Sequence, residues 1–329
     1  MFARDAWIVQ AMGLGHLLDG NHDPENAPCI DPTMPGGSGL LGIPDLSSLR
    51  EQLQAQKGDS LMLRTPNKPG DRRPPTPLVA VSYPKSGTHL LSDILQLVTG
   101  QEFYWPDHYP SNAISRGVLD QIPRGHFLIG HWHANDLDLF EEMLNRSCKV
   151  IVQYRDPRDQ ITSFYHYYTK VVATSKNMFA RILLDVSTEK ALNRLITGGT
   201  LVKDVEFPSL PVNQVAWLEQ WRRMCVLFHI PICFVSYEEV VNNKVDTIGR
   251  IARFLDTPLS REQCVTIARL TQFDQTSVTI RKTAVAKNIK RKGIVGDWQN
   301  SFTLVNKVVF KSVAQQILEC LGYESDDNW

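Results

Sequence analysis

The sequence has no apolar run of about eighteen residues, so it predicts no membrane-spanning helix. Its start, from Met1 to Trp7, lacks a basic segment followed by an apolar one, so we expect no secretory leader. Charge of one sign is not in excess, because 35 Lys and Arg residues balance 35 Asp and Glu residues. No overall field attracts nucleic acid or an anionic membrane, and we expect a cytoplasmic protein with neither partner.

The cysteine pattern of a metal site is also missing. There is no C-x-x-C pair and no histidine at the spacing of zinc ligands, so we expect no bound metal. Scattered cysteines of this kind are expected to be buried, reduced thiols. The six are Cys29, Cys148, Cys225, Cys233, Cys264 and Cys320.

Composition divides the chain into two parts. Residues 1–75 are expected to form an irregular N-terminal arm, rich in Pro and Gly, that wraps onto the rest of the protein. Within this arm we expect one helix between Leu46 and Leu63. In residues 76–329, apolar strand patterns alternate with helical ones. This order predicts an α/β fold whose central, mostly parallel sheet is flanked by helices. The acidic tail from Glu324 to Trp329 is expected to be frayed.

One stretch predicts a strand, a tight loop and a helix in succession. The apolar, β-branched run Val79–Ser82 is broken by Pro84 and Gly87. Apolar residues then recur at helical spacing from Leu90 to Val98. Loop amides, a helix N-terminus and the charge of Lys85 would converge there, which suits a phosphate. An ordinary turn is the alternative, and the Walker A pattern G-x-x-x-x-G-K-[ST] is absent.

Two further stretches carry cations suited to phosphate. Arg155 follows a strand expected at Lys149–Tyr154, and Ser163 lies on the helix that comes next. A guanidinium binds phosphate through two parallel hydrogen bonds. The segment Lys287–Lys292 holds four cations just before Gly293. The alternatives are a surface ion pair of Arg155 with Asp156 or Asp159 and an ordinary solvated charge run.

Taken together and in this order, the three stretches resemble the nucleotide-binding signatures of the cytosolic sulfotransferases, of which this chain looks like a divergent member. The resemblance runs from about Leu78 to Thr303. It implies a P-loop-like α/β fold and the donor 3′-phosphoadenosine 5′-phosphosulfate (PAPS), which leaves as 3′-phosphoadenosine 5′-phosphate (PAP). The donor-binding residues that it implies are Lys85, Ser86, Gly87 and Thr88 at the phosphosulfate, followed by His89 and Leu90, then Arg155, Ser163, Arg291, Lys292 and Gly293 at the 3′-phosphate, and Thr271 with Phe273 beside the adenine.

The family's catalytic histidine follows a strand in a pattern like Phe-Ile-Lys-Thr-His-Leu-Pro. The segment Phe127–His133 occupies that place, which points to His131 as general base. His133 competes for the role because it shares a strand face with His131. The resemblance also implies in-line sulfuryl transfer, with Lys85 neutralising the leaving phosphate. Ser163 is implied to hold Lys85 away from the donor until the acceptor arrives.

Several positions depart from the family pattern. Leu90 replaces an adenine-stacking aromatic residue, and Ile129 replaces a lysine near the transferred group. The tyrosine of a Tyr-Gly-Ser-Trp context has no clear counterpart. In the dimerisation pattern Lys-x-x-x-Thr-Val-x-x-x-Glu, Gln299 replaces the lysine and Val308 the glutamate. We therefore expect a monomer or a non-standard dimer.

The expected activity is sulfation of a hydroxyl or amine on a small-molecule acceptor. Aromatic residues in the variable segments are candidates to line an apolar pocket, whereas acidic residues nearby would suit a cationic acceptor. A non-catalytic or weakly active protein that binds PAP or PAPS is the main alternative. A nucleotide kinase is disfavoured by the missing Walker A pattern, and a secretory sulfotransferase by the missing membrane anchor.

Overall fold

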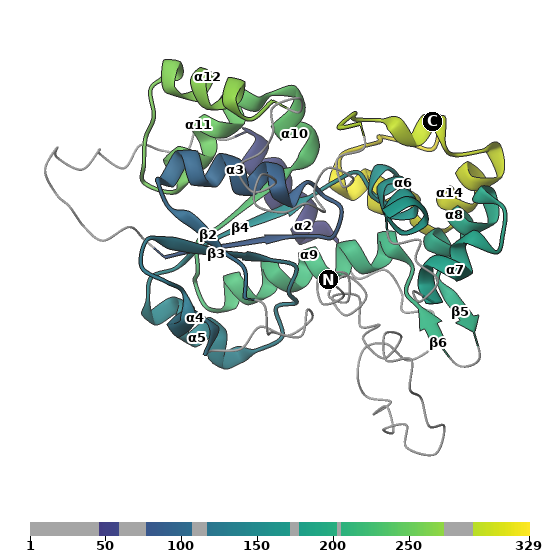
Figure 1. Ribbon diagram of the computed structural model, residues 1–329, viewed down its shortest axis with the longest axis horizontal. Helices are drawn as coiled ribbons and strands as arrows, with labels where there is room; N and C mark the ends of the chain where they lie inside the picture. The colour runs from purple at the N-terminus through teal and green to yellow at the C-terminus, as the bar shows by residue number, and fades with distance from the viewer. Residues whose placement is uncertain (1–45, 59–76, 107–116, 172–177, 203–204, 273–291) are drawn as a thin grey trace, which may run out of the picture.

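The computed structural model describes residues 46–58, 77–106, 117–171, 178–202, 205–272 and 292–329. Within these ranges the centre of the molecule is a parallel sheet with the strand order β2-β3-β1-β4-β7 (Figure 1). Its strands are β1 (Leu78–Ser82), β2 (Glu102–Tyr104), β3 (His126–Gly130), β4 (Lys149–Tyr154) and β7 (Ile232–Ser236), and a separate antiparallel pair contains β5 (Gly199–Val202) and β6 (Val205–Phe207). The predicted α/β class is confirmed.

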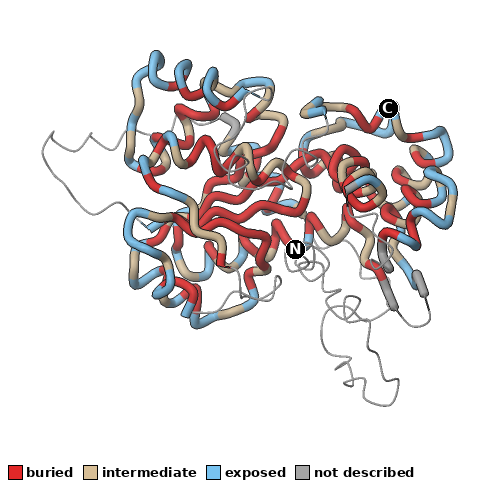
Figure 2. Tube along the Cα trace, viewed as in Figure 1, coloured by how far each residue is buried: buried red, intermediate tan, exposed pale blue. Residues whose placement is uncertain are grey.

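Helices cover both faces of this sheet, which Figure 2 shows as a buried layer. The α-helices are α2 (Ser47–Gly58), α3 (Thr88–Thr99), α4 (Val118–Gln121), α5 (Leu137–Asn145), α6 (Pro157–His166), α7 (Met178–Leu184), α8 (Thr188–Thr197), α9 (Leu210–Leu227), α10 (Tyr237–Asn242), α11 (Lys244–Phe254), α12 (Arg261–Leu270) and α14 (Leu304–Leu321). The described residues also contain a π-helix, η2 (Tyr167–Val171), and a 3-10 helix, η4 (Asp297–Asn300). Alternate β1 residues face the two layers: Ala80 packs with α3 and α11, and Val81 with α6 and α9.

The central strand β1 lies between β3 and β4. All its residues are buried, which explains its continuous apolar pattern. The register pairs Val81 with Gly130 of β3, and Ser82 with Gln153 of β4. Because the strands are parallel, the segments that leave β3, β1 and β4 emerge at one edge of the sheet. Open α/β sheets bind their ligands at this edge.

Helix α2, in the stretch expected to form the N-terminal arm, packs on the main domain. Leu49 and Leu53 are buried in the core. The Gln56 side chain pairs with the backbone of edge strand β7: its Nε2 donates to the Ile232 carbonyl at 3.1 Å, and its Oε1 accepts from the Phe234 amide at 2.7 Å. The side-chain amide of Gln56 therefore binds backbone groups at the edge of β7 in the way that a neighbouring strand would. The boundary between residues 1–75 and 76–329 stays a prediction.

The C-terminal tail is packed, so the expected fraying is wrong. The Trp329 ring lies edge-on to Trp298, with centroids 5.2 Å apart, and to Phe310. The Arg158 guanidinium lies over both indoles, at 4.1 and 4.6 Å, and Arg158 pairs with Glu324. Acidic composition indicated exposure, but an aromatic ring and a buried arginine from a distant part of the chain hold the tail in place.

Cysteines and membrane propensity give two smaller results. The five cysteines within the described ranges are buried free thiols: Cys148, Cys225, Cys233, Cys264 and Cys320. Cys29 lies outside those ranges. No helix among the described residues is long and apolar enough to cross a bilayer.

Candidate active site

The loop between β1 and α3 follows a left-handed path. Lys85 and Gly87 have φ values of 68° and 95°. A Cβ atom on Gly87 would lie 2.5 Å from Cδ2 of Tyr237, so both the backbone and the packing require glycine here. Gly87 is also the N-cap of α3 and offers no side chain to the first amides of the helix. The positive end of the helix dipole is thereby presented at the sheet edge.

His131 leaves the end of β3 beside this loop. It is buried, and its Nδ1 lies 2.5 Å from the Ser82 carbonyl oxygen. Because a carbonyl oxygen only accepts hydrogen bonds, Nδ1 carries the proton and Nε2 carries the lone pair. Burial lowers the pKa of His131 to about 3, and the charges of His89 and Lys85 act in the same direction against the Ser82 hydrogen bond. The imidazole is therefore neutral near physiological pH.

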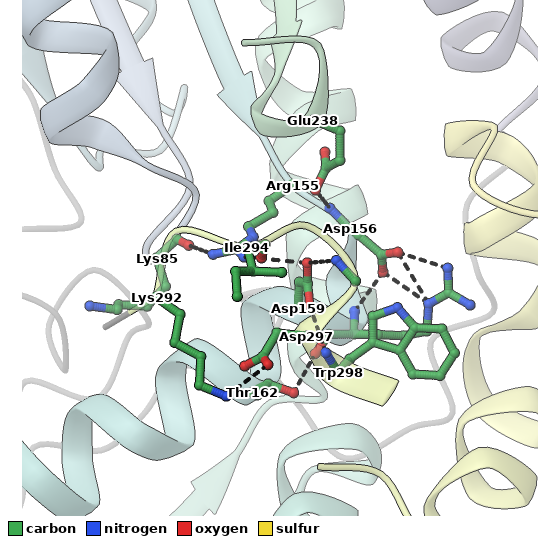
Figure 3. Close-up of polar contacts among 12 residues, drawn as sticks. Lys85, Arg155, Asp156, Asp159, Thr162, Glu238, Lys292, Ile294, Asp297 and Trp298 are labelled. Atoms are coloured by element: carbon green, nitrogen blue, oxygen red, sulfur yellow. Dashed lines mark hydrogen bonds and ion pairs between the residues drawn. The ribbon is translucent and has the colours of Figure 1, made fainter. Parts of the chain in front are cut away.

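Arg155 leaves the end of β4 and joins two loops (Figure 3). Its guanidinium donates to the Lys85 carbonyl at 3.5 Å and to the Ile294 carbonyl at 3.2 Å. It also pairs with Asp159 at 3.3 Å and lies 4.3 Å from the centroid of the Tyr237 ring. Only 7% of Arg155 is exposed, so its aspartate pair lies inside the site and is not the surface pair considered from the sequence.

Asp159 fixes the loop that carries Lys292 and Gly293. Its two carboxylate oxygens accept hydrogen bonds from the amides of Gly296 and Trp298, both at 2.8 Å. The carboxylate is fully buried. Lys292 pairs with Asp297 at 3.1 Å on the same loop, as Figure 3 shows. The second and third cationic stretches of the sequence therefore meet at Arg155 and Asp159, although Arg291 lies outside the described residues.

Ser163 lies one helical turn before Tyr167, the residue whose ring contacts Lys85. It is half-buried on α6, and its carbonyl accepts the Tyr167 amide. Residues at this spacing share a helix face. The ammonium of Lys85 lies over the Tyr167 ring, 4.0 Å from the ring centroid. The geometry thus places Tyr167, which sequence reasoning did not assign to Lys85, against this ammonium.

Comparison with known proteins identifies the family. Residues 75–322 match the sulfotransferase domain. The chain belongs to the sulfotransferase family. Sulfotransferase 1B1 of Mus musculus is 28% identical over 266 residues, which cover 73% of this chain and 81% of that protein. Sulfotransferase 6B1 of Danio rerio is 25% identical over 238 residues, which cover 69% and 73%.

Solved structures agree with this sulfotransferase fold. The crystal structure of mouse sulfotransferase SULT7A1 complexed with PAP has a TM-score of 0.56 at 23% identity, covering 75% of this chain and 87% of that chain. Retinol dehydratase in complex with androsterone and inactive cofactor PAP has a TM-score of 0.52 at 17% identity, covering 75% and 82%. The family assignment makes the chain a PAPS-dependent sulfotransferase, as the three sequence stretches predicted.

Two buried polar atoms of this sulfotransferase suit an anionic donor. Among the described residues, Ser86 Oγ and Arg155 Nε are buried without a hydrogen-bond partner. Buried polar groups are normally paired, so both fit the oxygens of a bound phosphate or sulfate group. Thr88 follows at the start of α3, where its hydroxyl pairs with Ser82 Oγ at 2.9 Å, and the half-buried His89 and Leu90 complete the first turn.

The residues expected beside the adenine are only partly visible. Thr271 lies buried at the end of α12, where its hydroxyl donates to the Ile267 carbonyl at 2.9 Å. Its own carbonyl accepts from Lys244 of α11 at 2.8 Å. These contacts join two helices of the sulfotransferase. Phe273 lies outside the described residues.

Sequence reasoning did not assign several residues of this site. The sequence indicated Asp159 only as a surface partner of Arg155, four residues along the chain. Tyr237 and Glu238 follow β7, and position after a parallel strand is the signal that would have found them. Gln160 donates to the Pro84 carbonyl at 3.1 Å, and no sequence pattern indicated that contact.

Glu238 gives this sulfotransferase a pH-dependent stability. Its carboxylate accepts from Tyr323 Oη at 2.7 Å and from the Asp156 amide at 3.2 Å. Burial, followed by repulsion from Asp156, raises the pKa of Glu238 from 4.5 to about 7. The folded state therefore binds this proton more tightly than the unfolded state, and ionisation of Glu238 lowers stability as the pH rises from about 4.5 to about 7.

Replacing Glu238 with glutamine tests this linkage. Glutamine keeps the shape but carries no charge, so we expect the variant's Tm to exceed that of the wild type by roughly 2–4 °C above neutral pH. The difference should shrink as the pH falls toward 5, where the wild-type carboxyl is protonated too. Calorimetry across this range, with the exposed Glu141→Gln as control, measures the effect. A Tm difference independent of pH would contradict the raised pKa.

Proposed function

We propose that this sulfotransferase moves the sulfuryl group of PAPS in line to a hydroxyl or amine of a small-molecule acceptor. His131 acts as the general base, and Lys85 stabilises the leaving phosphate. The proposal rests above all on the convergence of the ends of β3, β1 and β4, which deliver His131, Lys85 and Arg155 to one edge of the sheet. Base, leaving-group cation and anion-binding arginine are then adjacent, as the reaction requires.

The donor would be held from two sides. Lys85, Ser86, Gly87 and Thr88 surround the helix N-terminus that suits the phosphosulfate. Arg155, Ser163, Arg291, Lys292 and Gly293 are proposed to bind the 3′-phosphate. Arg155 contacts the loop at Lys85 and the loop at Ile294, which supports this division. Its guanidinium would then lie between the two phosphate-binding parts of the site.

His131 is preferred over His133 because of its neighbours. The His131 ring contacts Ser82, immediately before the donor loop, and lies edge-on to Trp105 with centroids 5.3 Å apart. His133 is directed to α9, where its Nδ1 lies 3.3 Å from Gln220 Oε1. A neutral, Nδ1-protonated His131 would use Nε2 to take the acceptor's proton.

Aromatic rings flank the proposed reaction centre and favour an acceptor with an apolar body. Trp105 lies against His131, and Tyr167 lies against Lys85. An acceptor ring between such side chains would gain apolar contact while its nucleophilic atom met the base. This arrangement supports a phenol or aromatic amine over a small cationic alcohol.

Arg155→Ala is the first test of the donor site. Loss of a charged, bidentate hydrogen bond to phosphate is expected to weaken PAP binding roughly 10- to 100-fold. Isothermal titration with PAP, compared with adenosine 5′-phosphate and ATP, measures this loss and the preference of the wild type for the 3′-phosphate. The exposed Arg261→Ala is the matched control. If the wild type showed no preference for the 3′-phosphate, the chain would be a relic of the family or a binding protein for another nucleotide.

The remaining expectations from the sequence are proposals of the same kind. We propose a cytoplasmic protein that needs no metal, binds neither nucleic acid nor membrane, and is a monomer or a non-standard dimer. Within the described residues, Leu304 and Val308, at two positions of the family's dimerisation pattern, are 81% and 67% exposed. Light scattering of the purified protein tests its mass, and cell fractionation tests its location.

A further inference from the structure

Helix α9 contacts all three strand-end segments of the proposed active site. In Figure 1 this helix crosses the molecule below the sheet. Five of its residues make hydrogen bonds to those segments and recur at helical spacing, so they lie on one face. We call this set the α9 template face; it consists of Asn213, Gln214, Trp217, Gln220 and Trp221.

The template face fixes the backbone that follows His131. The indole nitrogens of Trp217 and Trp221 both donate to the Trp132 carbonyl, at 2.7 and 2.9 Å. Both indoles are fully buried. Gln220 Oε1 accepts from the amide of Ala134 at 3.2 Å. Three hydrogen bonds from one helix therefore hold the two residues that flank His133, and the first of them directly follows His131.

Glycine at the end of β3 is part of the same arrangement. The Trp132 ring folds back over Gly130, where a Cβ atom would lie 2.3 Å from the ring. Glycine thus leaves room for the Trp132 ring, and the two indoles of α9 bind the backbone carbonyl of the same residue. His131 is then held in two places. Its ring is bound to the Ser82 carbonyl, and the backbone just after it is bound to α9.

The same face reaches the other two segments. Gln214 is fully buried, and its Nε2 donates to the backbone carbonyl of Arg155 at 2.6 Å. Asn213 Oδ1 accepts from Tyr83 Oη at 2.7 Å, next to the donor loop. These two contacts go to a backbone carbonyl and to a loop tyrosine. They are suited to position reacting groups without competing for their ligands.

We propose that the α9 template face positions His131 and the donor site relative to each other. Trp217 and Trp221 hold the backbone that follows His131, and Gln214 holds the backbone of Arg155. The inference rests on the proposed function and adds residues that touch neither donor nor acceptor. It makes two separable claims. The indoles set the alignment of the base, and Gln214 sets the position of Arg155.

Variants that keep shape but remove one hydrogen bond test the two claims. Trp217→Phe and Trp221→Phe keep an aromatic ring, and Gln214→Met keeps length. The assay follows PAP release from PAPS with para-nitrophenol, aniline or water as acceptor, beside titration with PAP and calorimetry. We expect the double indole variant to lose about tenfold in kcat with the Kd for PAP nearly unchanged. Gln214→Met should instead raise the Kd for PAP about fivefold.

A matched control separates positioning from general loss of stability. Val215 is buried on α9 and packs in the apolar core, so Val215→Ala should lower Tm while leaving kcat and Kd as in the wild type. If the double variant does not fold, either single indole variant leaves the Trp132 carbonyl one donor and should show a smaller fall in kcat. A looser His131 should also shift the acid limb of kcat to higher pH, because Lys85, His89 and Trp105 would no longer enclose it fully.

Opposite outcomes overturn the inference. Indole variants with unchanged kcat, or with changes in kcat and Kd that follow Tm as in Val215→Ala, would make α9 an ordinary structural helix. A wild type that binds PAP, needs Arg155 for binding and yet tolerates all three substitutions would overturn only the template. A wild type that neither binds PAP nor uses PAPS would overturn the proposed function, and the template with it.

Discussion

Replacing His131 with alanine is expected to lower sulfuryl transfer by about 10²- to 10⁴-fold, the usual contribution of a general base. The acceptor's proton would then have no neutral imidazole to receive it. The Kd for PAP should change little, since the proposed donor contacts come from the β1–α3 loop, from Arg155 and Ser163, and from the segment 291–293. Initial rates of PAP release at saturating PAPS, beside titration with PAP, measure the two quantities separately.

His133→Ala is the control for this substitution, because it removes the same group two residues away. Its ring lies at Gln220 of α9, so we expect a loss of less than about tenfold. Imidazole in solution should partly restore the His131→Ala variant, whose cavity can admit the free base. If His133→Ala abolishes transfer while His131→Ala remains active, the assignment of the base is wrong.

The donor side of the site was predictable because its signals are local in sequence. The run Val79–Ser82 is apolar on both faces, Gly87 needs a positive φ, and Arg155 follows a buried strand. Each of these features depends on neighbours along the chain, and parallel strand order then brings their ends together. Local pattern was therefore enough to predict that Lys85 and Arg155 follow parallel strands and lie at the same edge of the sheet.

Contacts between distant segments were not predictable in the same way. The hydrogen bonds that Asp159 accepts from the amides of Gly296 and Trp298 join residues 137 and 139 positions apart. The hydrogen bond from Trp221 to the Trp132 carbonyl joins residues 89 positions apart. No periodicity specifies such pairs, because they depend on how whole layers pack. The prediction of a frayed tail was wrong for this reason. The tail is acidic in composition, but the Trp329 ring contacts Arg158 and Trp298, which lie far from it in the sequence or on another element.

The structure shows where one departure from the family pattern lies. Ile129 lies buried in β3, on the face covered by α3 and α11, so it contributes to the core where the family pattern has a cation. Lys85 is a cation that the β1–α3 loop brings near His131, and its charge acts on the pKa of that residue. In the proposed mechanism, stabilisation of the leaving phosphate then falls to Lys85.

Lys85→Ala is accordingly expected to lower kcat by about 10²- to 10³-fold, as loss of one preorganised charge-stabilising group does elsewhere. The effect on the Kd for PAP should be smaller, because charge on the phosphate oxygen develops fully only as the sulfuryl group leaves. Rapid-quench measurement of one turnover isolates this step from product release. Lys85→Arg, which keeps the charge on a longer fork, should retain more activity than alanine.

Tyr167→Leu is the matched control for Lys85, since it removes the ring beneath the ammonium and leaves the charge. Tyr167 is buried and Lys85 is half-buried, so their cation–π contact contributes about 0.5–2 kcal/mol, and the change in kcat should stay within roughly 30-fold. The contrast between the two variants decides whether the lysine acts through its charge on the donor or through its packing on η2. Turnover that is equal in Lys85→Ala and the wild type would remove Lys85 from the mechanism, and equal losses in both variants would make its role structural.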